Sequence, residues 1–187
     1  MLLAVLTVSD RCSQGLMTGT AGPAVAAMLA RQWPQAEIRS GLVADDEDAI
    51  SAALEEFCHQ GTALVLTAGG TGFGPRDRTP EATRRVIDRE APGLAEAMRS
   101  LCAARSPFAW LSRAVAGLKG NTLIINLPGS RRGAEESLSS ILACSSTASK
   151  SPAEKPAEAS PRKAPAAPTP QAAPAQQEST PPKAPGQ

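Results

Sequence analysis

Short apolar runs alternate with helical patterns along the first 143 residues of the chain. The apolar runs are rich in Val, Ile and Leu, and they predict strands at residues 2–8, 38–43, 62–66, 114–118 and 122–126. Between these runs, apolar residues recur at spacings of three and four and predict helices at residues 22–31, 46–59, 79–87, from 92 onward, and 133–142.

Two of the helices have recognisable N-terminal signals. Acidic residues crowd the first turn of the helix at 46–59, where the helix dipole favours them. The next helix is predicted to begin with Thr79 as the N-cap, Pro80 at the first helical position and Glu81 in the first turn.

Strands that alternate with helices favour an α/β fold. We expect a three-layer sandwich in which a mostly parallel sheet carries helices on both faces. The strands at 114–118 and 122–126 are joined around Gly120 and Asn121, so this part is predicted to be a small antiparallel excursion.

The composition changes at residue 144. From there to residue 187 the chain has no Val, Ile, Leu, Met, Phe or Trp, and it holds ten of the 17 prolines. Such a segment lacks the apolar residues that repay chain entropy. The sequence therefore predicts a folded domain at residues 1–143 and a disordered, partly polyproline-like tail or linker at residues 144–187.

Composition excludes several classes of function. The formal net charge is +1, so the strong positive field expected of a nucleic-acid-binding protein is absent. With one His and 3% aromatic residues, neither a multi-histidine metal site nor a base-stacking surface is expected. The four cysteines are widely spaced and no apolar run is long enough to span a membrane, so we expect reduced thiols and a cytoplasmic protein.

A glycine-rich segment at residues 69–74 follows the strand at 62–66. Glycines in such a loop allow consecutive backbone N–H groups to point at one place, which is how proteins hold phosphate. The segment matches neither a Walker A loop nor the dinucleotide-binding fingerprint. The alternative is a tight turn that needs glycine only for its dihedral angles.

Two carboxylates are predicted at the same edge of the sheet. Asp45 follows the second strand and Asp77 follows the glycine loop, and hard oxygen ligands beside phosphates suit Mg²⁺. Alternatively, Asp45 caps a helix together with Asp46, and Asp77 forms an ion pair with Arg76 or Arg78. A third loop at residues 126–130 closes a strand and opens a helix, so its amides and the Ser130 hydroxyl can also face an anion.

Five segments together resemble a known family: TAGGTG at 67–72, PRDRTPEAT at 75–83, REAPG at 89–93, LSR at 111–113 and INLPGS at 125–130. They are similar to the molybdenum cofactor biosynthesis family, and within it to the MogA-like molybdopterin adenylyltransferases that include the G domain of gephyrin. The resemblance covers about residues 1–142. Each tripeptide alone is common, whereas the combination is highly specific.

The resemblance implies a trimer and a reaction in which Mg²⁺-ATP and molybdopterin give adenylylated molybdopterin and pyrophosphate. It implies a later partner that inserts molybdate, either a MoeA-like protein or a further domain. It assigns Asp45 and Asp77 as the catalytic and metal-binding acids. The substrate-binding residues implied by the resemblance are Ser9, Asp10, Gly69, Gly70, Thr71, Gly72, Thr79, Pro80, Glu81, Pro128, Gly129 and Ser130.

Two departures from the family are visible. The family's Asp-x-Ser-Gly ahead of the first helix is replaced here by residues 19–22, Gly-Thr-Ala-Gly, which lack the acid and the hydroxyl that help to shape the pocket. The family's Leu-Pro-x-x-Pro-His segment and its following helix are replaced by the polar tail, so we expect a domain truncated at its C-terminal end. These departures motivate two alternatives to the enzyme: a molybdopterin-binding carrier that cannot transfer AMP, and a gephyrin-like scaffold.

Overall fold

The computed structural model describes the backbone of residues 1–148 and the side chains of residues 1–142. The strands are β1 (Leu2–Val8), β2 (Glu37–Val43), β3 (Leu64–Ala68), β4 (Arg89–Glu90), β5 (Ala116–Lys119) and β6 (Thr122–Leu127). The helices are α1 (Asp10–Ser13), α2 (Ala21–Gln32), α3 (Glu47–His59), α4 (Thr79–Val86), α5 (Pro92–Ala103), the 3₁₀ helix η1 (Pro107–Leu111) and α6 (Arg131–Ala148).

One six-stranded sheet organises the described residues, in the order β2-β1-β3-β6-β5-β4. Strands β2, β1, β3 and β6 are parallel, whereas β5 pairs antiparallel with both β6 and β4. In the centre of the sheet, Leu66 of β3 is in register with Val5 on one side and Ile125 on the other. The predicted α/β fold and its antiparallel excursion are confirmed.

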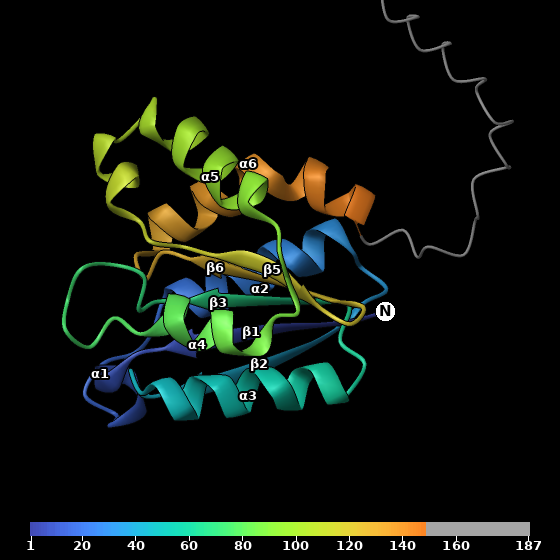
Figure 1. The fold of residues 1–187 in the computed structure, drawn as a ribbon, viewed down its shortest axis with the longest axis horizontal. Helices are drawn as coiled ribbons and strands as arrows, with labels where there is room; N and C mark the ends of the chain where they lie inside the picture. Colours follow the sequence, from blue (N-terminus) through green and yellow to red (C-terminus); the bar gives the residue numbers. More distant parts are fainter. Residues whose placement is uncertain (149–187) are drawn as a thin grey trace, which may run out of the picture. The chain divides into compact units, whose positions relative to one another are not determined.

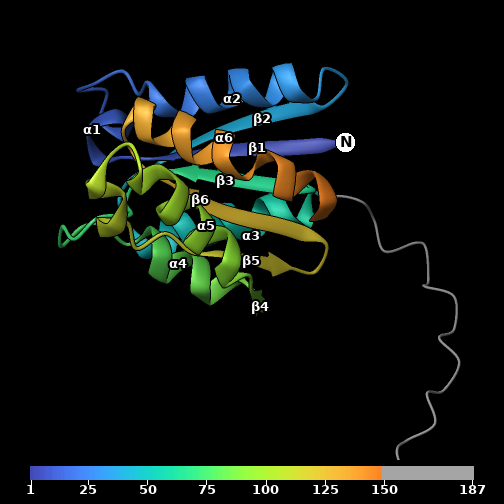
Figure 2. The ribbon, with the colours of Figure 1, turned by 90° about the horizontal axis from the view of Figure 1, so that it is seen from above.

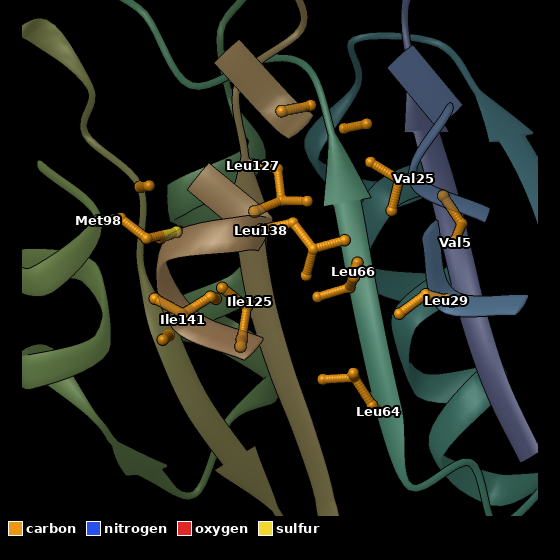
Figure 3. Packing of buried hydrophobic residues seen from close by; sticks show 14 of the residues in the cluster. Val5, Val25, Leu29, Leu64, Leu66, Met98, Ile125, Leu127, Leu138 and Ile141 are labelled. Carbon is orange, nitrogen blue, oxygen red and sulfur yellow. The ribbon is translucent and has the colours of Figure 1, made fainter. Parts of the chain in front are cut away.

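Helices cover both faces of the sheet. Figure 1 shows α3 and α4 on one face and α2, α5 and α6 on the other, and Figure 2 shows α2, α6 and α5 from above. The larger core lies under the second group, where residues such as Leu29 of α2 and Leu138 of α6 pack on Leu66 and Ile125 of the sheet (Figure 3). Because apolar side chains fill both faces, strand β3 is buried along its whole length.

The carboxyl ends of the parallel strands meet at one edge of the sheet. The loops that follow β1, β2, β3 and β6 are therefore brought together, although they are far apart in the sequence. Figure 1 shows this edge at the end opposite the labelled N-terminus, where the long loop between β3 and α4 projects.

The structure corrects the predicted start of α4. Thr79 is not the N-cap: it lies in the first turn, and its buried hydroxyl donates to the Gly69 carbonyl at 2.9 Å. Arg78 occupies the cap position without a side-chain bond. The reason is tertiary, because the glycine loop offers this hydroxyl a buried acceptor that a free helix end would not provide.

Helix α6 differs from its predicted bounds at both ends. It begins at Arg131 rather than residue 133 and continues to Ala148, so its last residues come from the segment assigned to the tail. The remainder of the predicted disordered tail, residues 149–187, lies outside the described residues. Helix α1, η1 and the two-residue β4 are further elements that the hydrophobic pattern did not predict, because each is too short to show a period.

We expect Leu138→Ala to destabilise the domain strongly. The Leu138 side chain is fully buried in the larger core, so its truncation removes apolar burial and leaves a cavity. The expected loss is about 2–5 kcal/mol in the free energy of unfolding. Urea denaturation checks this value against Ser139→Ala, an exposed neighbour on the same helix for which we expect a change within about 0.5 kcal/mol. A loss below about 1 kcal/mol for Leu138→Ala would contradict the packing of α6.

Candidate active site

The glycine loop after β3 is held by close backbone contacts. Gly69 and Gly70 have φ angles of +123° and +63°, which side chains rarely adopt. A Cβ on Gly69 would lie 2.1 Å from the Val8 carbonyl oxygen, and a Cβ on Gly129 would lie 3.2 Å from the Gly69 Cα. The first two glycines are therefore required by backbone geometry, as the tight-turn interpretation predicts.

The later glycines make room for a carboxylate. A Cβ on Gly72 or Gly74 would lie 3.0 Å or 2.8 Å from Asp77 Oδ2. This oxygen accepts the Gly74 N–H at 2.7 Å. The loop thus folds back around the Asp77 carboxylate, which a plain turn would not need to do.

A cavity of about 560 Å³ opens beside this loop. Its wall is formed by the glycine loop, by η1 and the end of α5, and by the start of α6. The predicted site residues in the wall are Gly70, Thr71, Gly72, Asp77, Pro128, Gly129 and Ser130. The structure thus brings the glycine loop and the third loop, residues 126–130, together around one cavity.

Asp45 does not belong to the cavity wall and is not a helix cap. Asp46 caps α3 by accepting the Ala49 N–H at 2.9 Å. The Asp45 carboxylate instead accepts the Asp10 N–H at 2.8 Å through Oδ2, and the Asp45 N–H donates to the Asp10 carboxylate at 3.0 Å. Asp45 Oδ1 faces the loop, 3.2 Å from the position of a Cβ on Gly70. The capping interpretation of Asp45 is therefore wrong.

The loop after β1, which contains Ser9 and Asp10, holds Asp45 in place through hydrogen bonds. Ser9 caps α1 by accepting the Cys12 N–H at 3.3 Å, and Asp10 binds both Asp45 and Arg76. Arg76 donates two hydrogen bonds to the Asp10 carboxylate, at 2.9 and 2.8 Å. The hydrogen bond from Arg76 lowers the pKa of Asp10, so Asp10 stays ionised beside the site.

Neither adjacent arginine forms an ion pair with Asp77 in the part of the chain that the structure describes. Arg76, one of the two adjacent candidates, is paired with Asp10 instead. The ion-pair interpretation of Asp77 is therefore wrong.

The electrostatics of the two catalytic candidates suit a cation. Burial raises the pKa of Asp45 above its ordinary value, and the negative charges of Asp10 and Asp77 raise it further. Within the described residues, Asp45 Oδ1 and Asp77 Oδ1 accept no hydrogen bond from the protein. No group of three or more His, Cys, Asp or Glu side chains suited to a metal occurs there. Two free carboxylate oxygens fit Mg²⁺, which takes one or two carboxylates together with phosphate oxygens and water.

Thr79 binds the glycine loop directly and Glu81 binds it through Arg113, and the cavity wall includes neither of them nor Pro80. The Thr79 N–H and hydroxyl bind the carbonyls of Gly70 and Gly69 at 3.1 and 2.9 Å. Burial alone would raise the pKa of Glu81, but the hydrogen bond and the charge of Arg113, the backbone N–H of Glu81 and the charge of Arg78 together outweigh it and lower the pKa overall. Thr79 and Glu81 therefore hold the glycine loop without lining the cavity.

The third loop combines backbone and hydroxyl groups. Pro128, Gly129 and Ser130 line the cavity at the N-terminal end of α6. Ser130 Oγ accepts the Gly133 N–H at 3.2 Å, so this hydroxyl also caps the helix.

Arg113 is a site residue that the sequence reasoning missed as a candidate. Its side chain binds the Gly72 carbonyl at 2.6 Å and also reaches the Asp77 carbonyl and the Glu81 carboxylate. Its own N–H donates to the Thr71 carbonyl at 3.0 Å. The only signal was the LSR segment at 111–113, because a contact over 41 residues leaves no local pattern.

The Gly-Thr-Ala-Gly segment at residues 19–22 faces a different cavity. Gly19 and Gly22 line a hollow of about 370 Å³ beside β1 and β2, together with Thr7, Cys12 and Leu42. Neither glycine belongs to the wall of the cavity beside the glycine loop. Gly19, which stands where the family has the acid, therefore borders this hollow rather than that wall.

Comparison with known proteins identifies the family. Residues 4–145 match the family model described as a probable molybdopterin binding domain. The chain belongs to this molybdenum cofactor biosynthesis family. The match accounts for the sheet and nearly all of its helices, and it confirms the family predicted from the five sequence segments.

Individual members of the family are similar over the same region. The molybdopterin adenylyltransferase of Helicobacter pylori J99 is 38% identical over 141 residues, covering 74% of this chain and 80% of that protein. The Thermus thermophilus molybdopterin biosynthesis enzyme MoaB has a TM-score of 0.73 and 43% identity, covering 82% of this chain and 99% of that structure. The Drosophila melanogaster molybdenum cofactor synthesis protein cinnamon is 37% identical over 140 residues, but the match spans only 23% of its length.

We expect Asp45→Asn to stabilise the domain at neutral pH. The raised pKa means that folding costs free energy once Asp45 must ionise, so this cost is absent below the ordinary Asp pKa of about 3.9 and complete above the raised pKa. The amide removes the charge and keeps an acceptor for the Asp10 N–H. We expect a melting temperature about 2 °C higher at pH 7 and no difference at pH 3.

The matched control is Asp46→Asn, because Asn caps a helix as well as Asp does. Thermal unfolding from pH 3 to pH 8 should show little change for this control. A melting temperature for Asp45→Asn that is lower than that of the unsubstituted protein at pH 7 would contradict the repulsion among Asp10, Asp45 and Asp77.

Proposed function

We propose that this chain transfers AMP from ATP to molybdopterin and releases pyrophosphate. The observation that carries the proposal is the placement of a glycine loop and two acidic side chains around one edge of the sheet, next to a cavity. The predicted reaction agrees with the names of relatives in the family, such as the adenylyltransferase of Helicobacter pylori. The match spans only 23% of cinnamon, so the proposal covers the adenylyl transfer alone and no other activity of such longer proteins.

The chemistry is a displacement at phosphorus. The terminal phosphate of molybdopterin attacks the α-phosphorus of ATP, a new P–O bond forms, and the bond to the β-phosphate breaks with its electron pair leaving on pyrophosphate. Such reactions depend mainly on positioning and on stabilisation of negative charge. A terminal phosphate is already ionised, so the absence of a histidine in the site is no obstacle.

The residues divide the work by position. Backbone N–H groups of the glycine loop and of the third loop are placed to receive phosphate oxygens. Asp45 and Asp77 would hold Mg²⁺, which when bound neutralises charge on the phosphates. Asp10 and Arg76 keep Asp45 in place.

The carrier and scaffold alternatives are less well supported. Gly19 and Gly22, which belong to one of the two departures that motivated the carrier interpretation, line a separate hollow, and the matched protein of similar length is named as an adenylyltransferase. We therefore favour the enzyme.

A homotrimer is part of the proposal, and exposed apolar side chains support an assembly. Large apolar residues are exposed at the end of α5 and on η1, where Phe108 and Trp110 are 78% and 60% exposed. Several large apolar side chains exposed next to one another are typical of contact regions between chains.

The remaining parts of the proposal concern partners and place. We propose that adenylylated molybdopterin passes to a MoeA-like protein or domain that inserts molybdate. No helix among the described residues is long and apolar enough to cross a membrane. The cytoplasmic location stays a prediction from the cysteine spacing, and Cys12, Cys58 and Cys102 form no disulfide.

We expect Asp77→Asn to lower the rate of AMP transfer by about 100-fold or more, because it removes a charge at the phosphates. The assay incubates the full chain with molybdopterin, ATP and Mg²⁺ and detects adenylylated molybdopterin by mass. The amide keeps an oxygen that can accept the Gly74 N–H, so circular dichroism and melting temperature should change little.

The control for this assay is Asp48→Asn, an exposed acid of α3 that pairs with Arg85 and should transfer AMP at the unsubstituted rate. Full activity of Asp77→Asn would remove the metal-site argument. No product from the folded, unsubstituted chain would favour the carrier instead.

We expect Trp110→Glu to dissociate the proposed trimer, because a charge buried at an apolar contact is costly. Light scattering coupled to size-exclusion chromatography measures the mass of the full chain and of the variant. Ala52→Glu adds the same charge to an exposed position on α3 and should leave the mass unchanged. A monomeric unsubstituted chain would overturn the trimer, and a trimeric Trp110→Glu would exclude this surface from the contact.

A further inference from the structure

Arg113 binds the glycine loop through both its backbone and its side chain. Its backbone N–H binds the Thr71 carbonyl at 3.0 Å, and its Nε binds the Gly72 carbonyl at 2.6 Å. The two ends of the guanidinium reach the Asp77 carbonyl and the Glu81 carboxylate. One residue between η1 and β5 therefore joins the glycine loop, the Asp77 loop and the first turn of α4.

The direction of these bonds fixes the direction of the loop amides. All peptide bonds among the described residues are trans, and in a trans peptide the C=O and the N–H point to opposite sides. The Thr71 carbonyl shares a peptide bond with the Gly72 N–H, and the Gly72 carbonyl shares one with the Phe73 N–H. These two N–H groups must therefore point away from Arg113.

The same two N–H groups have no acceptor within the described part of the chain. Gly72 also belongs to the wall of the cavity. Unpaired N–H groups in consecutive residues form a concave anion site when they are held in one orientation. Arg113 itself is not in the cavity wall, so its effect on a ligand is exerted through the loop.

We propose that Arg113 is a positioning residue that turns the Gly72 and Phe73 N–H groups toward the phosphates of the nucleotide. This inference rests on the proposed AMP transfer, because it assigns the nucleotide phosphates as the ligand. A lysine at this position carries the charge, but its single ammonium group cannot reach the Gly72 carbonyl, the Asp77 carbonyl and the Glu81 carboxylate in the geometry of a planar guanidinium.

The chain contains a matched control. Arg99 of α5 donates to the carbonyls of Ser112 and Ala114, at 3.3 and 3.1 Å, and so holds the backbone on both sides of Arg113. Both arginines are partly buried and bind backbone carbonyls. Arg99 makes no hydrogen bond to residues 69–78 in the described structure. Its removal therefore reports the cost of losing a structural arginine here.

The experiment compares Arg113→Met, Arg113→Lys and Arg99→Met in the full chain. Calorimetry measures the binding of Mg²⁺ with a nucleotide whose α,β-bridging oxygen is replaced by methylene, so that no transfer occurs. Hydrogen exchange of peptides within residues 69–78 measures the order of the loop. The adenylylation assay gives kcat and the KM values for ATP and molybdopterin.

We expect Arg113→Met to weaken binding of the nucleotide analogue by about tenfold or more, because charge-assisted phosphate contacts need fixed donors. Exchange within residues 69–78 should rise, and the KM for ATP should rise more than the KM for molybdopterin. Arg113→Lys should recover part of the affinity. Arg99→Met should bind the analogue within about twofold of the unsubstituted chain, even where its melting temperature falls as far as that of Arg113→Met.

Three results would overturn the inference. The first is unchanged exchange at residues 69–78 in Arg113→Met. The second is increased exchange with unchanged affinity, and the third is an equal loss of affinity in Arg99→Met. Failure of the proposed function looks different, because the folded, unsubstituted chain would then bind no nucleotide analogue and form no product.

Discussion

The contact between Gly69 and the end of β1 is the constraint on which the site depends. A Cβ at Gly69 would overlap the Val8 carbonyl oxygen, and Gly129 approaches Gly69 from the other side. The loops that follow β1, β3 and β6 can therefore bring their backbones into direct contact only because this position has no side chain. The approach brings the Asp10 loop, the glycine loop and the Pro128 loop to one sheet edge. Glycines accordingly recur in the cavity wall beside this contact, at positions 70, 72 and 129.

The acidic side chains occupy this edge at a cost to stability. Asp45 is brought near Asp10 and Asp77, and both burial and these charges raise its pKa. Arg76 compensates Asp10, because its two hydrogen bonds are made to that carboxylate. Asp45 and Asp77 are left with free oxygens, which is the arrangement expected where a cation and phosphates complete the charge balance.

The sequence predicted the fold well because long periodic segments dominate it. The stripe along α3 and the buried run of β3 are intrinsic to the chain, and their type depends little on context. Short elements were missed for the opposite reason, since α1 and η1 contain one turn or little more. The start of α4 was misassigned because the Thr79 hydroxyl binds the Gly69 carbonyl, a partner supplied by tertiary structure.

The sequence predicted which residues gather at the site, but not which of them line the cavity and which only support it. Glycines and acids after parallel strands pointed to the correct edge, because that rule follows from topology. Which residues line the cavity and which support it depends on contacts across the fold. Asp77, Thr79 and Glu81 come from one short segment, yet only Asp77 lies in the cavity wall. Arg113 binds Gly72 although the two residues are 41 positions apart in the sequence, and no local sequence pattern predicts such a contact.

This division explains how a chain with one histidine and no tyrosine can carry the proposed site for phosphoryl transfer. The hydroxyls of Ser9 and Ser130 are partly engaged as helix caps, and Thr79 is engaged with the loop. Among the predicted site residues, the groups that remain for a ligand are mainly backbone N–H groups, the Thr71 hydroxyl and two carboxylates. Backbone donors need no particular side chain, but they need a fixed orientation. The demanding residues are therefore those that set the backbone: the glycines that permit its conformation, and the buried hydroxyl and the arginine that hold its carbonyls away from the cavity.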